Sequence, residues 1–180
     1  IAIEVQGLLD IEGYAYDMNV ACSSTTFGIQ NAYNMIAAGN ARRVLMVNPE
    51  FTSGHLNCAD RDSHFIFGDA ATAVIIEAAD QRKVDHAFKI VDSKVMTKFS
   101  NNIRNNFGFL NRCETSEATE EDRLFHQQGR KVFKDVTLLT VKLLHELLEK
   151  NNIKPEQLSR LWLHQANINM NNLIAEKIMG

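Results

Sequence analysis

The apolar and polar positions of this chain predict a mixed α/β protein. Residues Ile3–Leu9 have a weakly helical pattern, and Tyr14–Val20 alternates and is rich in aromatic and apolar side chains, as strands are. Helical spacing then runs from Phe27 to Ala37, until Gly39-Asn40 ends it. The continuous apolar run Arg43–Val47 is typical of a buried parallel strand, so this part of the sequence predicts a βαβ unit.

The middle of the chain predicts loops and short strands. The polar stretch Thr52–Ser63 is typical of a loop, and His64–Ala79 contains two apolar segments separated by a Gly68-Asp69 turn. Val84–Met96 is a further strand candidate. Ser100–Glu121 is rich in Asn, Glu and Thr and has little periodicity, which predicts a long surface loop.

The last part of the chain predicts two helices around a short strand. Apolar residues recur at helical steps from Gln128 to about Asn151-Asn152, which indicates one long amphipathic helix. A turn at Pro155-Glu156 and a brief buried strand at Leu161–Leu163 follow. The apolar residues that mark the final helix are Leu173, Ile174 and Ile178.

Composition and charge exclude several classes of partner. The 180 residues are 45% apolar and 23% charged, the range of ordinary soluble globular proteins. With 19 basic and 22 acidic side chains the net charge is −3, which offers no broad surface for nucleic acid or an anionic membrane. No apolar run approaches the roughly 20 residues that a membrane-spanning helix needs. We therefore expect neither a nucleic-acid partner nor a membrane span.

The cysteines argue against a covalent or metal framework. Cys22, Cys58 and Cys113 are odd in number and lack CxxC spacing, so the sequence predicts neither disulfides nor a zinc site. No other metal site is expected. Reduced thiols are typical of a cytoplasmic protein.

Two side chains with reactive chemistry directly follow predicted strands. Cys22 precedes a helix whose first turn, Ser23-Ser24-Thr25-Thr26, has N-cap chemistry, so free N–H groups and the helix dipole can stabilise a thiolate and an oxyanion. His164 opens the polar group His164-Gln165-Ala166-Asn167 at the kind of sheet edge where α/β proteins place their sites. An arbitrary cysteine or histidine is more often a structural residue. The repeated arrangement of strand, reactive side chain and helix hints at an internal duplication.

Five segments in order carry a family resemblance. They are DMNVACSSTTFGIQNAYNMI, RRVLMVNPEF, DRDSHFIFGDAATAVIIE, GRKVFKDV and LWLHQANINMNNLIAEKI. Together they resemble the β-ketoacyl-acyl carrier protein synthase III family over nearly the whole chain, except a weak region from about Asp80 to Asp122. The chain starts without Met and ends abruptly, so we expect a central fragment of such an enzyme.

The resemblance implies an α/β fold of the thiolase-like, layered αβαβα kind, made of two duplicated halves and incomplete at both ends. Residues 1–80 are then the later part of the first half and carry Cys22. Residues 81–180 are the early part of the second half and carry His164.

The resemblance also implies an acyltransferase of fatty acid or related lipid biosynthesis. Cys22 is then the nucleophile that takes an acyl group from a CoA thioester, which is a substrate, and no cofactor is expected. His164 is the hydrogen-bond donor and acid/base group that helps to decarboxylate a malonyl thioester on acyl carrier protein. The implied partners are acyl-CoA, acyl carrier protein and a second copy in a homodimer. The family's third catalytic residue, an asparagine, falls beyond Gly180.

Four more residues are implied on the CoA or acyl carrier protein side of the site. Arg61 resembles the arginine of a DR motif that lines the CoA nucleotide site, and Lys134 a basic residue near the mouth of the site. Phe133 would wall the acyl tunnel, and Asn167 belongs to the HQAN motif. The plain alternatives are a solvated loop arginine, a solvated lysine and an ordinary core aromatic. Ser23-Ser24 stands where the commonest family members have Ala-Gly.

Three other functions remain open from the sequence. One is another CoA-dependent condensing enzyme of the same fold, either hydroxymethylglutaryl-CoA synthase-like or catalysing a head-to-head acyl condensation. A second is a non-catalytic acyl-binding partner subunit, against which the presence of both Cys22 and His164 argues. A third is an unrelated cysteine hydrolase, for which the ordered motifs would be coincidence.

Overall fold

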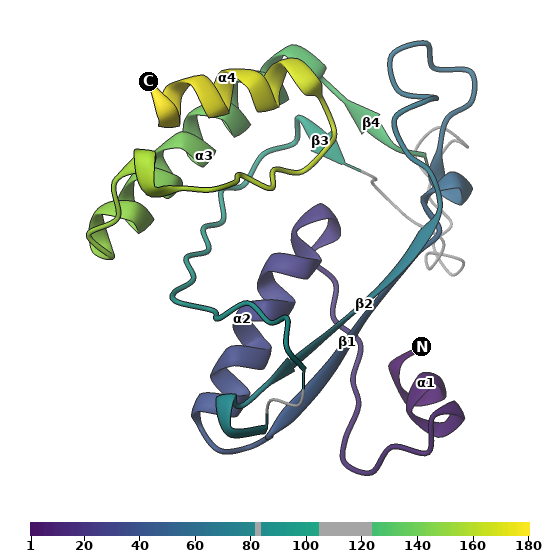
Figure 1. Ribbon diagram of the computed structural model, residues 1–180. Coiled ribbons are helices and arrows are strands. Elements are labelled where there is room, and N and C mark those ends of the chain that lie inside the picture. The colour runs from purple at the N-terminus through teal and green to yellow at the C-terminus, as the bar shows by residue number, and fades with distance from the viewer. Residues whose placement is uncertain (82–83, 105–123) are drawn as a thin grey trace. The chain divides into compact units, whose positions relative to one another are not determined.

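The computed structural model describes residues 1–81, 84–104 and 124–180, which form two compact units (Figure 1). Unit 1 consists of residues Ile1–Glu50 and Ala70–Val95, and unit 2 of Phe51–Asp69 and Met96–Gly180. The predicted division into 1–80 and 81–180 concerns duplicated halves of a larger fold, and it stays a prediction.

The described residues of unit 1 form two helices and one antiparallel pair of strands. Its helices are α1 (Ala2–Leu8) and α2 (Ser24–Ala37), and the 3₁₀ turn η1 (Ala21–Ser23) leads into α2. Strands β1 (Arg43–Glu50) and β2 (Ala70–Glu77) pair in antiparallel register along their whole length. The turn η3 (Ala79–Gln81) follows β2. The two predicted helices and the strand after α2 are thus confirmed.

The predicted βαβ unit is wrong in this structure. Among the described residues, the neighbour of β1 is β2, in antiparallel orientation, so the apolar run Arg43–Val47 belongs to no parallel sheet there. Tyr14–Val20 is extended but joins no sheet among the described residues. A strand exists only where a neighbour satisfies its backbone N–H and C=O groups, and alternation in the sequence does not supply that neighbour.

A small core lies between α2 and the two strands. Ala32 of α2 is 2% exposed and Ile76 of β2 is 8% exposed. Gly28 is buried on the same helix, and a Cβ built there would collide with the Sδ of Met46 on β1. Glycine therefore allows α2 to approach the sheet. Arg43 adds a cross-strand ion pair to Glu77, with the nitrogen and oxygen 2.8 Å apart.

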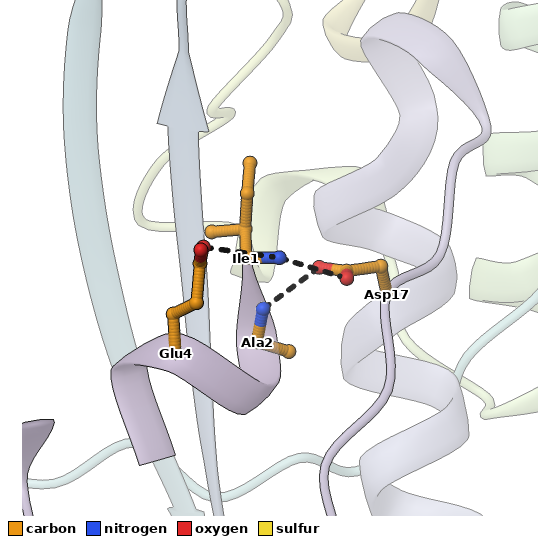
Figure 2. Close-up of polar contacts among 4 residues, drawn as sticks. All are labelled: Ile1, Ala2, Glu4 and Asp17. Carbon is orange, nitrogen blue, oxygen red and sulfur yellow. Dashed lines mark hydrogen bonds and ion pairs between the residues drawn. The ribbon is translucent and has the colours of Figure 1, made fainter. Parts of the chain in front are cut away.

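Asp17 attaches α1 to the segment that leads to Cys22 (Figure 2). Its Oδ1 accepts the backbone N–H of Ala2 at 3.0 Å, and its Oδ2 accepts an N–H of the Ile1 backbone nitrogen at 3.1 Å. The carboxylate of Glu4 lies 3.7 Å from the same nitrogen. The Ala2 N–H bond, followed by the bond from Ile1, holds the pKa of Asp17 below its usual value. Asp17 thus caps the first helix from a distant part of the sequence.

Unit 2 is built around two helices that pack against each other (Figure 1). They are α3 (Gly129–Lys150) and α4 (Ile168–Met179), and α4 buries Ile174 and Ile178, each 3% exposed. Both helices were predicted and are confirmed. The smaller elements of this unit are η2 (Thr52–His55), the paired strands β3 (Ile103–Arg104) and β4 (His126–Gln127), and η5 (Pro155–Gln157).

Several predicted strands and one predicted loop differ from the structure or lie outside the described residues. Val84–Met96 and Leu161–Leu163 belong to neither of the two sheets that the described residues form, so neither predicted strand is present there. Of the two apolar segments in His64–Ala79, the first forms turns and the second forms β2. The predicted loop Ser100–Glu121 falls largely on residues 105–123, outside the described residues. Within the described ranges, no helix combines the length and hydropathy needed to span a bilayer.

Candidate active site

Cys22 is an exposed, free thiol in the turn η1, immediately before α2. The residue before it, Ala21, has a φ of +47°, in the left-handed region that disfavours a residue with a Cβ. This conformation costs about 1–2 kcal/mol relative to the right-handed one. Backbone strain of this kind persists only where surrounding interactions hold it, and it is concentrated at functional sites.

Short hydrogen bonds hold this turn in place. The side chain of Asn19 accepts the backbone N–H of Ala21 at 2.8 Å. The Ser24 hydroxyl accepts the backbone N–H of Val20 at 2.9 Å and donates to the C=O of Ala21 at 2.8 Å. The backbone N–H of Ser23 donates to the C=O of Val20 at 3.1 Å. The chain therefore closes on itself around Cys22.

The first turn of α2 has the electrostatic character expected of a nucleophile site. The helix has 14 residues, and no acidic side chain lies in its first turn to offset the positive end of the dipole. Backbone N–H groups at such a terminus can stabilise a thiolate and hold the oxyanion formed when a thiol attacks a thioester. The predicted setting of Cys22 is thus confirmed on its helix side, whereas the segment before it is extended chain and no strand.

The predicted N-cap chemistry takes a different form in the structure. Ser23 occupies the N-cap position of α2, yet its side chain makes no capping hydrogen bond. The hydroxyl of Ser24 instead points back to the turn before the helix. Both serines are typical cap residues, and residue type alone does not reveal which backbone group a hydroxyl reaches.

A second polar contact connects the start of α2 to the sheet. The hydroxyl of Thr25 donates to Oδ1 of Asn48 on β1 at 3.3 Å, and Nδ2 of Asn48 donates to the hydroxyl of Thr72 on β2 at 3.3 Å. Asn48 and Thr72 are paired residues of the strand register. Asn48 was not singled out in the sequence, since its contacts join residues 23 and 24 positions apart in the chain.

His164 lies in unit 2, exposed, on the extended segment before α4. Asn167, from the same polar group, is the N-cap of α4, and its Oδ1 accepts the backbone N–H of Met170 at 3.0 Å. This contact satisfies one of the free donors at the start of the helix. Asn167 therefore has a defined structural role, and Cys22 and His164 are each placed within their own unit.

Arg61 is exposed on a tight turn that its neighbour Asp60 stabilises. The carboxylate of Asp60 accepts the hydroxyl of Ser63 at 2.5 Å and the backbone N–H of Asp62 at 3.0 Å. These two bonds, the Ser63 hydroxyl first, hold the pKa of Asp60 below its usual value. Ser63 is completely buried, so this turn is well fixed and presents Arg61 to solvent.

The other predicted binding residues lie on the first turns of α3. Lys134 is exposed, and Phe133 is partly buried and accepts the Thr137 hydroxyl on its backbone C=O at 2.7 Å. Their roles toward CoA or acyl carrier protein stay predictions. In the part of the chain that the structure describes, no three His, Cys, Asp or Glu side chains form a group that could hold a metal ion.

Comparison with known proteins points to one family. The family model for 3-oxoacyl-[acyl-carrier-protein (ACP)] synthase III matches residues 16–98. The chain is 59% identical over 180 residues to a beta-ketodecanoyl-[acyl-carrier-protein] synthase of Pseudomonas aeruginosa, covering all of this chain and 51% of the relative. It is 30% identical over 164 residues to a beta-ketoacyl-[acyl-carrier-protein] synthase III of Methylococcus capsulatus, covering 91% of this chain and 49% of the relative.

A solved structure supports the fold. The crystal structure of 3-oxoacyl-[acyl-carrier-protein] synthase III from Aquifex aeolicus matches with a TM-score of 0.72 and 26% identity, covering 98% of this chain and 52% of that one. The predicted thiolase-like α/β fold is confirmed by this match. The chain spans about half the length of the curated relatives that it matches.

Proposed function

We propose that the protein of this chain is an acyltransferase that condenses an acyl group with a malonyl thioester, as its similarity to the 3-oxoacyl-[acyl-carrier-protein] synthase III family implies. One observation carries the proposal: the family's cysteine, Cys22, is an exposed thiol in a strained turn at the start of a helix. An inert buried cysteine would need neither the exposure nor the strain.

In the first half-reaction the Cys22 thiolate attacks the carbonyl carbon of an acyl-CoA. A carbon–sulfur bond to Cys22 forms, and the carbonyl oxygen becomes an oxyanion that the N–H groups at the start of α2 stabilise. The intermediate collapses, the bond to the CoA sulfur breaks, and CoA leaves as a thiolate that takes up a proton. The acyl group is then stored on the enzyme while the second substrate binds.

In the second half-reaction a malonyl thioester on acyl carrier protein loses CO₂. The electron pair of the broken carbon–carbon bond forms an enolate, and His164 donates a hydrogen bond to the enolate oxygen. The enolate carbon attacks the carbonyl of acyl-Cys22, the new carbon–carbon bond forms, and the Cys22 thiolate leaves. The product is a β-ketoacyl chain two carbons longer than the starter, and no step calls for a cofactor.

The name of the Pseudomonas aeruginosa relative suggests the starter. A β-ketodecanoyl product has ten carbons, and two of them come from the malonyl unit, so ten minus two leaves an eight-carbon acyl group. At 59% identity over the whole chain, we extend this substrate class to the present protein. The proposed starter is therefore octanoyl-CoA.

The proposed substrates give roles to the remaining residues. Arg61 would bind the CoA phosphates from its fixed turn, and Lys134 would meet the acidic acyl carrier protein. Phe133 would line the acyl tunnel, and Asn167 would hold the start of α4 next to His164. We further propose a cytoplasmic homodimer.

Mass spectrometry of the intact protein tests this proposal. After incubation with acetyl-, butyryl-, octanoyl- or palmitoyl-CoA, we expect an octanoyl adduct that is absent in Cys22→Ala. Cys58→Ala is the matched control, because Cys58 is also an exposed free thiol and its loss should leave the adduct unchanged. His164→Ala should form the adduct but release no β-ketoacyl product with malonyl-acyl carrier protein. Absence of an adduct with every CoA thioester would contradict the proposal.

A further inference from the structure

The hydroxyl of Ser24 joins the two sides of the turn that carries Cys22. It accepts the N–H of Val20 at 2.9 Å and donates to the C=O of Ala21 at 2.8 Å. Ser24 is itself the first residue of α2, so one side chain connects the incoming chain, the strained residue and the helix. Both bonds are within the distance range of good hydrogen bonds.

The strained residue is held on both of its peptide groups. Asn19 accepts the N–H of Ala21 at 2.8 Å, and Ser24 donates to its C=O at 2.8 Å. The C=O of Ala21 belongs to the same planar peptide unit as the N–H of Cys22, so its orientation helps to set the position of the Cys22 Cα and the start of its side chain. The backbone N–H of Ser24 also donates to this C=O, so the hydroxyl adds a second donor that opposes release of the strain of about 1–2 kcal/mol at Ala21.

We propose that Ser24 is a positioning residue, whose hydroxyl holds the strained Val20–Ser24 turn and thereby aims the Cys22 thiol for attack on the acyl donor. The proposal rests on the function proposed above, since it assigns a purpose to the orientation of Cys22. In this role Ser24 acts only through the backbone, without a bond to the substrate.

The chain provides a matched control for this proposal. Ser23 is adjacent, has the same side chain and occupies the N-cap position, but makes no capping hydrogen bond. Cys58 provides a second control, because it is an exposed thiol in unit 2 that does not depend on this turn. A rate that falls in Ser24→Ala but not in Ser23→Ala, and at Cys22 but not at Cys58, indicates a loss of local positioning. A general change in the fold would affect both members of each comparison.

Two rates would be measured in the intact protein for Ser24→Ala, Ser24→Thr and Ser23→Ala. The first is acyl transfer from octanoyl-CoA to Cys22 as a function of octanoyl-CoA concentration. The second is alkylation by iodoacetamide, in which the thiolate displaces iodide, followed at Cys22 and Cys58 separately by peptide mass spectrometry.

We expect Ser24→Ala to lower the maximal acylation rate on the order of 10- to 100-fold. The half-saturating octanoyl-CoA concentration should not change, because a misaligned thiol reacts more slowly but does not alter substrate binding. Alkylation at Cys22 should fall while alkylation at Cys58 does not. Ser24→Thr keeps the hydroxyl and should restore most of the rate, and Ser23→Ala should match the wild type.

Different results would overturn the two proposals. Wild-type rates in Ser24→Ala, or equal losses in Ser23→Ala, would reject the positioning role. A parallel fall at Cys22 and Cys58 would also reject it, since that result indicates a general change in the fold. If the wild type is never acylated but alkylation of Cys22 still depends on Ser24, the proposed acyltransferase function is wrong and the positioning role of Ser24 is retained.

Discussion

Both carboxylate oxygens of Asp69 accept hydrogen bonds from Ser53, one from its backbone N–H at 2.9 Å and one from its hydroxyl at 2.6 Å. The adjacent Thr52 hydroxyl donates to the C=O of Gly68 at 3.0 Å. Asp69 immediately precedes β2, and Ser53 lies in η2. These bonds connect the two ends of the segment Phe51–Asp69. The sequence indicates the Gly68-Asp69 turn only as an interruption between two apolar segments.

The Asp69–Ser53 contact makes the stability of the fold depend on pH. The Ser53 hydroxyl, followed by its N–H, holds the pKa of Asp69 below the ordinary 3.8. A lowered folded-state pKa contributes stability that is complete above the unfolded pKa and is lost as the pH falls through the folded pKa. We expect the thermal midpoint of the wild type to fall more steeply below pH 3.8 than that of Asp69→Asn.

Melting curves recorded by circular dichroism over a pH series would check this. Asp62→Asn is the control, because Asp62 is an exposed carboxylate in the same segment and its mutation should leave the pH dependence of the wild type in place. Identical pH dependence in the wild type and Asp69→Asn would contradict the prediction.

Asn167 should contribute to stability through its cap on α4. Asn167→Ala removes the acceptor of the Met170 N–H, and we expect a loss of about 1 kcal/mol in the free energy of unfolding. Asn167→Asp keeps a capping oxygen and should be close to the wild type. Urea denaturation measures both. Asn172→Ala, an exposed change inside the same helix, is the control, and an equal loss there would argue that the cap is unimportant.

Gly28 should tolerate a larger side chain only if the Met46 side chain moves. Alanine normally stabilises a helix interior by roughly 0.5–1 kcal/mol relative to glycine, and we expect that gain for Gly7→Ala in α1, where a Cβ meets nothing within 4 Å. Gly28→Ala should lose the gain, because its Cβ collides with the Met46 side chain.

The stability of Gly28→Ala can also be measured in a Met46→Ala background, which tests whether the Met46 side chain causes the loss. With the Met46 side chain removed, the penalty of Gly28→Ala should disappear, and the two changes should be non-additive in the free energy of unfolding. Additive effects would mean that Met46 is not what restricts this position.

Asn48 should couple α2 to the sheet. Asn48→Ala breaks its bonds to Thr25 and Thr72, and we expect a loss of about 1 kcal/mol in stability. A double-mutant cycle of Asn48→Ala with Thr25→Val measures the coupling directly, and a value near zero would show that the 3.3 Å contact between them contributes little. Thr26→Val, at an exposed neighbouring position, is the matched control for the threonine change.

The sequence predicted the helices correctly, including the helix that follows Cys22, but the strand predicted before Cys22 is wrong. Residues Phe27 to Ala37 and the stretch after Gln128 repeat with helical spacing, and the structure has α2 and α3 there. A helix satisfies its backbone within its own segment, so a local pattern is sufficient to identify it. The ordered motifs also indicated a resemblance to the synthase III family, and the family model matches residues 16–98, a range that contains Cys22 and not His164.

Strand pairing and the anchoring of the Cys22 turn were decided by the tertiary structure alone. Tyr14–Val20 and Leu161–Leu163 have strand-like sequences yet belong to neither of the two described sheets, and β1 has an antiparallel partner that begins 20 residues after it ends. The back-bonding of Ser24 and the Asp69–Ser53 pair likewise depend on which groups meet in space. Residue type and spacing determine what a side chain can donate or accept, whereas its partner exists only once distant parts of the chain have come together.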